Sequence, residues 1–131
     1  MAGYSTVNLR EVENQGPNFG LDENDMELRM ARVPLDCENA GISFLRLAPG
    51  YRSPIGHRHK QQEEIYILVN GSARMKIDDD FVELKPLTAV RVHPESMRCY
   101  EGGPEGAELI AIGAPNTGPG DGDVQPGWWS D

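Results

Sequence analysis

The segment from Gly50 to Gly71 constrains what this chain can fold into more than any other part of it. The segment contains His57 and His59, followed by Glu64 at the start of a strongly β-prone run. On an extended strand, side chains two residues apart point to the same face. A short turn after His59 would bring Glu64 back toward both imidazoles. Two imidazoles and one carboxylate on one side of a metal form the arrangement used for non-haem iron and related divalent ions.

The remainder of the chain predicts an all-β fold. The 131 residues include 15 glycines and 10 prolines, which suits many short strands joined by turns, and no segment shows a convincing helix pattern. Asn70-Gly71 is the strongest hairpin signal, so we expect one strand to end there and a second to begin. Strands are expected at residues 27–33, 42–47, 64–69, 73–77, 81–84, 89–92, 97–100 and 108–112.

Changes in composition divide the chain into three parts. Trp128 and Trp129 are unusual in a polar segment, and we expect them to dock on the barrel or on a partner. The alternative is that they cap a pocket as a lid. The parts are an N-terminal arm at residues 1–26, with at most one short strand around Thr6 to Leu9, a barrel domain at 27–113, and a Gly/Pro-rich tail at 114–131.

Charge and cysteine content narrow the class of protein. The formal charge of −9 leaves no basic stripe to neutralise phosphates, so neither nucleic acid nor an anionic membrane is expected as a partner. The chain shows no apolar signal segment and no run of membrane-spanning length. Cys37 and Cys99 are few and far apart, which predicts two free thiols in a reducing compartment. We therefore expect a cytoplasmic protein.

Side-chain alternation after residue 63 bears on assembly. If Glu64 points into the barrel, Tyr66 and Leu68 do so too, whereas Ile65 and Ile67 point outward. Outward aliphatic side chains need a cover, which either the N-terminal strands or a second subunit supplies. Of these, we favour a homodimer.

The His-rich segment resembles the first motif of the cupin superfamily. That motif is a glycine, about five residues, His-x-His, three or four residues, Glu, six residues and Gly; here Gly50, His57, His59, Glu64 and Gly71 match, with six residues after Gly50. The resemblance covers roughly residues 40 to 115 and is to small single-domain cupins, many functionally uncharacterised. It implies a double-stranded β-helix, the cupin jelly-roll barrel, with His57, His59 and Glu64 as ligands of Fe, Mn, Ni or Zn.

The second cupin motif is only partly present. Aligning Pro94 and Ser96 on the family's turn puts Arg98 where the fourth ligand, a histidine, is expected. Arginine cannot ligate a metal, and at about 5 Å it opposes each unit of cation charge by roughly 3 kcal/mol at an effective dielectric near 20. Arg98 could instead pair with Glu64 and leave a pocket without metal. His93 is a further candidate for the fourth ligand.

Two hypotheses for function follow from these residues. The first is a metal-dependent enzyme of the oxygenase or isomerase/epimerase class, in which Arg98 holds a small anionic substrate through its planar fork. Tyr66 and Tyr100 share the inward parity and would line the substrate cavity, although core packing also explains them. The second hypothesis is a non-catalytic ligand-binding or sensor cupin with a degenerate metal site.

Overall fold

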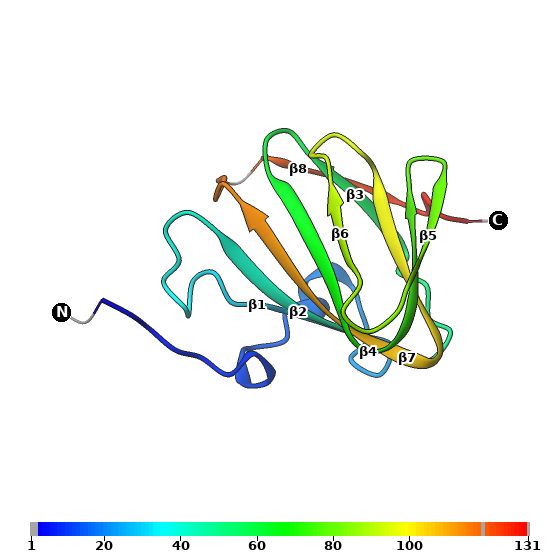
Figure 1. Cartoon of the computed structure of the whole chain (residues 1–131), viewed down its shortest axis with the longest axis horizontal. Coiled ribbons are helices and arrows are strands. Elements are labelled where there is room, and N and C mark those ends of the chain that lie inside the picture. Colours follow the sequence, from blue (N-terminus) through cyan, green and yellow to red (C-terminus); the bar gives the residue numbers. More distant parts are fainter. Residues whose placement is uncertain (1–2, 119, 131) are drawn as a thin grey trace.

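Two long, bent strands organise the fold. In the computed structural model, which describes residues 3–118 and 120–130, β4 (Glu63–Ile77) and β7 (Arg98–Ala114) pair antiparallel along most of their length (Figure 1). The remaining elements are short: β1 (Met26–Met30), β2 (Gly41–Leu47), β3 (Ile55–His59), β5 (Asp80–Leu84), β6 (Ala89–Val92), β8 (Gly122–Pro126) and the 3-10 helices η1 (Leu9–Glu11) and η2 (Gly16–Phe19).

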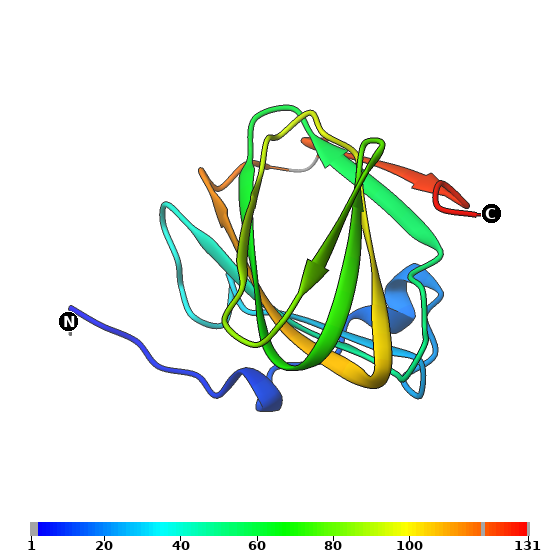
Figure 2. The same cartoon turned by 45° about the vertical axis from the view of Figure 1, so that its right-hand side comes forward.

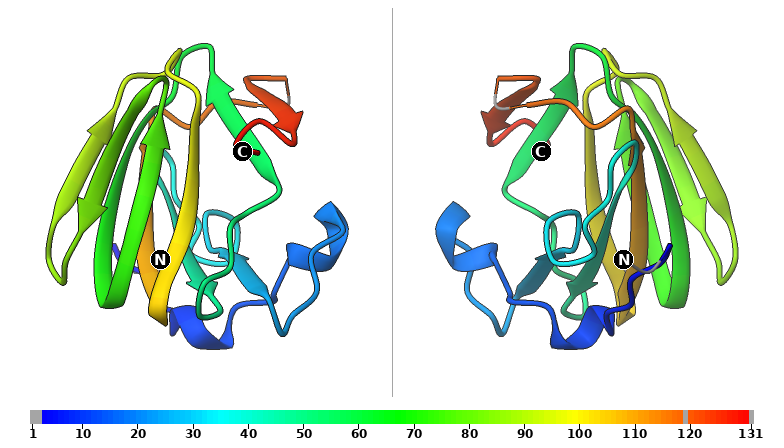
Figure 3. Two further views of the ribbon diagram at one scale, coloured as in Figure 1. Left: turned by 90° about the vertical axis from the view of Figure 1, so that its right-hand side faces the viewer. Right: turned by 90° about the vertical axis from the view of Figure 1, so that its left-hand side faces the viewer.

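The two ends of β4 and β7 belong to different layers. One end lies in a layer ordered β1-β2-β7-β4-β6, and the other lies in a layer ordered β8-β3-β7-β4-β5. Figure 2 shows β4 and β7 curving from one layer into the other, and both views in Figure 3 show β3 and β8 across from the β4–β5 side. The antiparallel sheet therefore curls on itself, as the prediction of a β-barrel required.

The bend occurs at Gly71, where the sequence predicted a hairpin. Gly71 has φ +80° and faces Gly106 with φ +82°, and a Cβ on Gly71 would lie 2.1 Å from the Gly106 carbonyl oxygen. The strand register shifts on both sides of this point, between Leu68 and Asn70 and between Gly71 and Ala73. The hairpin prediction is wrong because the left-handed glycine serves a bulge, which bends a strand without ending it.

The same correction applies to β7 and to the N-terminal arm. The strands predicted at 97–100 and 108–112 are parts of one strand, β7. No strand forms around Thr6 to Leu9 in the described arm. Instead η1 begins there, because the side chain of Asn8 accepts a hydrogen bond from the Arg10 backbone N–H and caps its first turn.

The predicted alternation along β4 is confirmed. Tyr66 is 1% exposed and Leu68 is 0% exposed, and both belong to the core. Ile65 and Ile67 are half-buried on the outer face, where they pair with Ile112 and Ile110 of β7. The core is therefore inside the curl, and the outer face of the β4–β7 pair carries an aliphatic stripe. Its members are Ile65, Ile67, Ile110 and Ile112.

The two cysteines are free thiols. Cys37 is half-buried, Cys99 is buried, and both are free, as predicted. Burial raises the pKa of the Cys99 thiol to about 11, so it is the protonated form that packs here. Within residues 3–118 and 120–130, no helix is long and apolar enough to span a membrane.

Candidate metal centre

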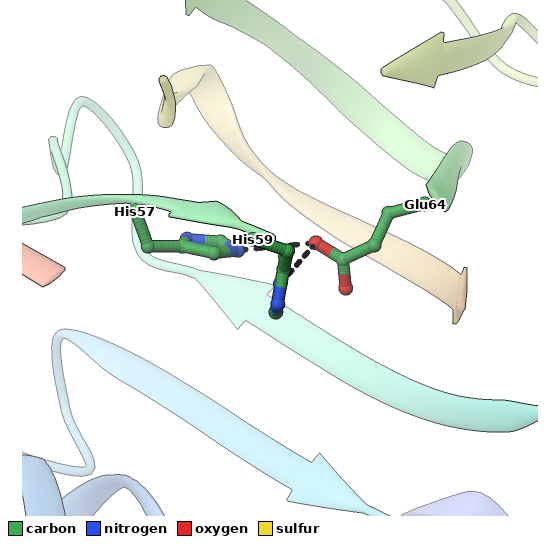
Figure 4. Close-up of side chains that lie close together, drawn as sticks. All are labelled: His57, His59 and Glu64. Atoms are coloured by element: carbon green, nitrogen blue, oxygen red, sulfur yellow. Dashed lines mark hydrogen bonds and ion pairs between the residues drawn. The ribbon is translucent and has the colours of Figure 1, made fainter. Parts of the chain in front are cut away.

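Two neighbouring elements bring the three predicted ligands together. His57 and His59 lie on β3 with one residue between them, and Glu64 lies near the start of β4, after a turn at residues 60–62. Figure 4 shows both imidazoles and the carboxylate converging on one point. One ligand atom from each residue lies within 4.8 Å of the other two. The spacing of the motif thus produces a cluster that could hold a metal ion.

A single carboxylate oxygen is the focus of this cluster. Glu64 Oε1 lies 3.1 Å from His57 Nε2 and 3.2 Å from His59 Nε2, and it accepts a 2.7 Å hydrogen bond from the Tyr66 hydroxyl. Burial alone would raise the pKa of Glu64, but the hydrogen bonds from His57, His59 and Tyr66 outweigh it and hold that pKa well below its usual range. Glu64 therefore stays a carboxylate and supplies a fixed negative charge.

Asp121, from a distant part of the chain, contacts His59 of this cluster. Its Oδ2 lies 3.0 Å from His59 Nδ1, and its Oδ1 accepts a 2.9 Å hydrogen bond from the Gln61 backbone N–H. Burial would raise the pKa of Asp121, but hydrogen bonds led by the Gln61 backbone lower it. The sequence analysis missed this residue, because nothing in the tail's composition indicates that Asp121 returns to His59.

The Asp121 contact bears on which ring nitrogen of His59 carries the proton. An ionised carboxylate only accepts hydrogen bonds, and a carboxylate faces each ring nitrogen, so a neutral His59 can donate to only one of the two. When the proton lies on Nδ1 and is donated to Asp121, the lone pair of Nε2 faces Glu64 Oε1 at 3.2 Å. Two acceptors at that distance repel unless a proton or a cation stands between them. Metal-binding histidines show this same arrangement, with the second ring nitrogen donating to a carboxylate.

The C-terminal tail is held against the barrel by β8 and by the two tryptophans. β8 pairs with β3, placing Gly122 opposite His59. Trp129 is 6% exposed and lies under the guanidinium of Arg52, with the Arg52 carbon 4.3 Å from its ring centroid. Trp128 packs on Gly56, where an added Cβ would meet its ring at 2.9 Å. The prediction that the tryptophans dock on the barrel is confirmed, and neither belongs to the cavity wall.

Arg98 lies next to the cluster but does not face the cavity. Its side chain is 0% exposed, and its guanidinium donates to backbone carbonyls, among them Ser96 at 3.0 Å and Pro94 at 3.3 Å. Its Nη2 is 3.8 Å from Glu64 Oε1. Direct contact of Arg98 with a substrate stays a prediction; in this structure the residue binds the loop after β6 and places positive charge next to Glu64.

His93 is not a fourth ligand. Its side chain is exposed, and its Nδ1 accepts a 3.2 Å hydrogen bond from the Glu95 backbone N–H in the turn before β7. The cluster formed by the described residues contains only His57, His59 and Glu64. The loop geometry explains this, because the His93 backbone turns its carbonyl, not its ring, toward Arg98.

A cavity of about 850 Å³ opens beside the cluster. Tyr66 and Tyr100 line it with His57, and the two tyrosine rings lie 5.7 Å apart between centroids. Burial, followed by the charge of Glu64, raises the pKa of both hydroxyls, so both remain protonated and can donate hydrogen bonds. Contact of these tyrosines with a substrate stays a prediction.

Comparison with solved structures identifies the architecture. A cupin protein from Bacteroides fragilis superposes with a TM-score of 0.71 at 22% identity, over 88% of this chain and 86% of that one. The oxalate decarboxylase of Bacillus subtilis gives a TM-score of 0.75 at 18% identity, over 94% of this chain and 32% of that one. The chain has the cupin fold.

The Streptomyces nucleoside dehydratase Pac13 has the same fold. Its structure superposes with a TM-score of 0.69 at 14% identity, over 96% of this chain and 92% of that one. No protein-family model and no curated protein matches the sequence. At these identities the likeness shows the cupin fold, and the function has to be argued from the residues of the site.

Proposed function

We propose that this protein is a metal-dependent cupin enzyme that acts on a small molecule in its barrel cavity. One observation carries the proposal: His57, His59 and Glu64 converge beside the cavity, and Asp121 contacts the second ring nitrogen of His59. The oxygenase and the isomerase or epimerase classes both fit this arrangement. The cavity and the cluster are contiguous, because all three ligands also belong to the cavity wall.

The donor set fits Fe, Mn, Ni or Zn. Imidazole nitrogens suit these ions, and one carboxylate beside two imidazoles is typical of sites that keep open positions for substrate or water. When bound, the ion would supply Lewis-acid or redox chemistry to a substrate. The protein's own contribution is to orient His59 through Asp121 and to keep Glu64 ionised. Tyr100 would donate a hydrogen bond to the substrate, whereas Tyr66 donates its hydroxyl proton to Glu64 and would contact the substrate as part of the cavity wall.

Arg98 limits how tightly an ion binds. Its guanidinium lies 3.8 Å from the ligand oxygen of Glu64 and is shielded from water, so its charge acts on the cluster with little screening. The Arg98 guanidinium and a metal cation would both interact with the Glu64 carboxylate, and they would repel each other. We therefore expect weaker metal binding than in a cupin with a fourth ligand at this position.

A second candidate is a ligand-binding or sensor cupin that needs no ion. It is favoured by the hydrogen bonding of Glu64 Oε1, which Tyr66 satisfies at 2.7 Å while both imidazoles lie within reach. If both imidazoles donate from Nε2, Glu64 Oε1 accepts hydrogen bonds from both of them as well as from Tyr66, without a metal. Among the structural neighbours, variants of Streptomyces Pac13 with a histidine or a tyrosine replaced are described with uridine. The same cavity could here hold an uncharged ligand.

We also expect the protein to form a homodimer through the aliphatic stripe on the outer face of β4 and β7. Ile67 and Ile110 lie opposite each other in that stripe and are half-buried in the single chain. Sedimentation equilibrium is expected to show a dimer, which Ile67→Glu converts to a monomer. A natural protein that sediments as a monomer would remove this expectation without affecting the site.

Metal content distinguishes the two candidate functions. Metal-free protein is exposed separately to Fe(II), Mn(II), Ni(II) and Zn(II), desalted and analysed by inductively coupled plasma mass spectrometry. The proposal predicts about one ion per chain for at least one metal, and the same for the matched control His93→Ala. Retention below about a tenth of that for every metal, with an unchanged melting temperature, would contradict the proposal and favour the ion-free candidate.

A further inference from the structure

The cavity has two unlike sides. The histidine and carboxylate cluster occupies one side, and the inner faces of β1 and β2 form the other. Leu28 and Leu45, which pair across these strands, line the cavity together with Met30. Leu21, just after η2, also lines it and is 7% exposed. A ligand that reaches the cluster can therefore also contact hydrocarbon along β1 and β2.

The apolar character continues to the mouth of the cavity. Within the described residues, six large hydrophobic side chains are exposed, and three of them line this cavity: Phe19 at 47%, Val33 at 71% and Val124 at 59%. These residues come from η2, from the segment after β1 and from β8, so three distant segments place apolar side chains at one opening. A group of exposed apolar side chains at one site indicates a binding surface.

Most of the charged groups on the cavity wall belong to the cluster or contact it. Of the described acidic and basic residues on the cavity wall, Glu64 belongs to the cluster with its two histidines, and Asp121 contacts the cluster through His59. The remaining one, Arg32, is exposed and packs its aliphatic stem against Gly41. No charged group among the described wall residues comes from β1 or β2 themselves. Ser43 is the polar side chain that these two strands contribute to the wall, so a polar ligand body would replace few of its hydrogen bonds to water there.

We infer that the ligand is amphipathic, with a small oxygen-donor head at the His57–His59–Glu64 cluster and a hydrocarbon body along the β1–β2 wall. The position of the head rests on the proposed metal site, whereas the body rests only on the wall and the mouth. A cavity of about 850 Å³ suits a molecule of drug-like size, so an acid of one or two carbons would leave most of it empty. This inference adds a hydrocarbon body to the small anionic substrate that the sequence predicts.

The test uses a homologous series of straight-chain carboxylic acids, from butyrate to decanoate, and the corresponding alcohols. Binding is measured by calorimetry on metal-loaded and metal-free protein. The affinity of the acids for the loaded protein is expected to rise about fourfold for each added methylene, the equivalent of about 0.8 kcal/mol, until the wall is covered. A parallel series of aryl-substituted acids distinguishes an alkyl body from an aromatic one.

Variants at the mouth localise the effect. Val124→Ser and Phe19→Ser change exposed side chains, so the fold is retained, and each is expected to weaken decanoate several-fold while leaving butyrate unchanged. Leu87→Ser is the matched control, because Leu87 is 81% exposed and is not part of the cavity wall. An equal loss in the Leu87 variant would overturn the placement of the body.

The outcomes separate this inference from the proposed function. An affinity that does not change with chain length in either series overturns the amphipathic ligand, even if metal binds. A rise with chain length for the alcohols on metal-free protein, with no ion retained under any condition, supports the apolar wall and overturns the metal-dependent function alone. A rise for the acids only when metal is loaded supports both.

Discussion

The segment at residues 50–71 and the tail at residues 114–130 contribute to the same site in different ways. The first supplies the ligand atoms of His57, His59 and Glu64 and follows a recognisable spacing. The tail supplies Asp121, whose carboxylate accepts a hydrogen bond from His59 across 62 residues of sequence. β8 of the tail pairs with β3, so both segments meet on adjacent strands. The comparison shows that the ligands and their orientation are encoded in separate places.

The difference matters because orientation is part of affinity. A histidine that can rotate or change tautomer directs its metal-binding nitrogen at the ion for only part of the time. A carboxylate hydrogen-bonded to its second nitrogen holds the ring in one position. The tail is in turn held by Trp129 beneath Arg52 and Arg74 and by Trp128 on Gly56. Changes to either segment should therefore weaken the same site, by amounts that rank the two contributions.

Loss of a ligand should have the largest effect. Glu64→Gln keeps the size of the side chain but removes its charge and one acceptor oxygen, so metal affinity should fall by more than about 100-fold, beyond the range of outer-sphere changes. The readout is a competition titration against a chromophoric chelator. His93→Ala, an exposed histidine outside the cluster, should bind as the natural protein does. A Glu64→Gln protein of natural affinity would mean that the cluster is not the binding site.

Loss of the orienting carboxylate should rank second. Asp121→Asn has one acceptor oxygen in place of two, so it cannot serve both the Gln61 N–H and His59 Nδ1. Metal affinity should fall by about 10- to 100-fold. In the metal-free protein, nitrogen-15 spectra of the His59 ring should change from the Nδ1–H tautomer to a mixture.

The neighbouring Asp123 offers a matched control for that variant. Asp123 lies on β8 two residues from Asp121, but its side chain is 55% exposed and pairs with Arg58 on the surface. Asp123→Asn should leave both the affinity and the His59 spectrum unchanged. Equal effects of the two variants would show that the tail acts through general charge, not through orientation.

Loosening the tail should rank third. Trp129 is 6% exposed, so Trp129→Ala should lower the free energy of unfolding by about 3 kcal/mol and speed hydrogen exchange in β8. Metal affinity should fall less than in Asp121→Asn, because a detached tail still returns part of the time. Trp129→Phe retains a ring for Arg52 and Arg74 and should behave almost as the natural protein. Unchanged exchange in β8 would show that other contacts hold the tail.

The smallest effect should come from a carboxylate outside both segments. Burial raises the pKa of Glu27, but hydrogen bonds from Arg46 and Arg29 outweigh it and lower that pKa below 4.5. A lowered pKa stabilises the fold above 4.5, and that stabilisation is lost as the pH falls. Glu27→Gln should therefore reduce stability by about 1 kcal/mol near neutral pH, with the difference shrinking in acid. A difference in melting temperature that grows in acid would reverse this sign.

The sequence predicted the barrel and the three clustered residues because both depend on local spacing. Alternation places Tyr66 and Leu68 inside, and the interval from His59 to Glu64 spans one short turn. Such local relations do not depend on contacts with residues far along the chain, so the sequence alone predicts them.

Other features could not be predicted, because they depend on partners far along the chain. Gly71 has the conformation expected of a hairpin glycine, but whether the strand ends or bends there depends on Gly106 opposite it. Arg98 was placed correctly beside Glu64, yet its side chain direction depends on the loop carbonyls that it binds. Asp121 gives no local signal, since its partner lies on β3.

The most direct test of the metal centre is anomalous diffraction from a crystal soaked with the ion that the protein retains best. The account predicts one anomalous peak per chain between His57, His59 and Glu64, about 2.1 Å from each ligand atom. His59 Nδ1 should still be paired with Asp121. A cluster without a peak, in which His57 and His59 remain hydrogen-bonded to Glu64 in the presence of saturating metal, would contradict it.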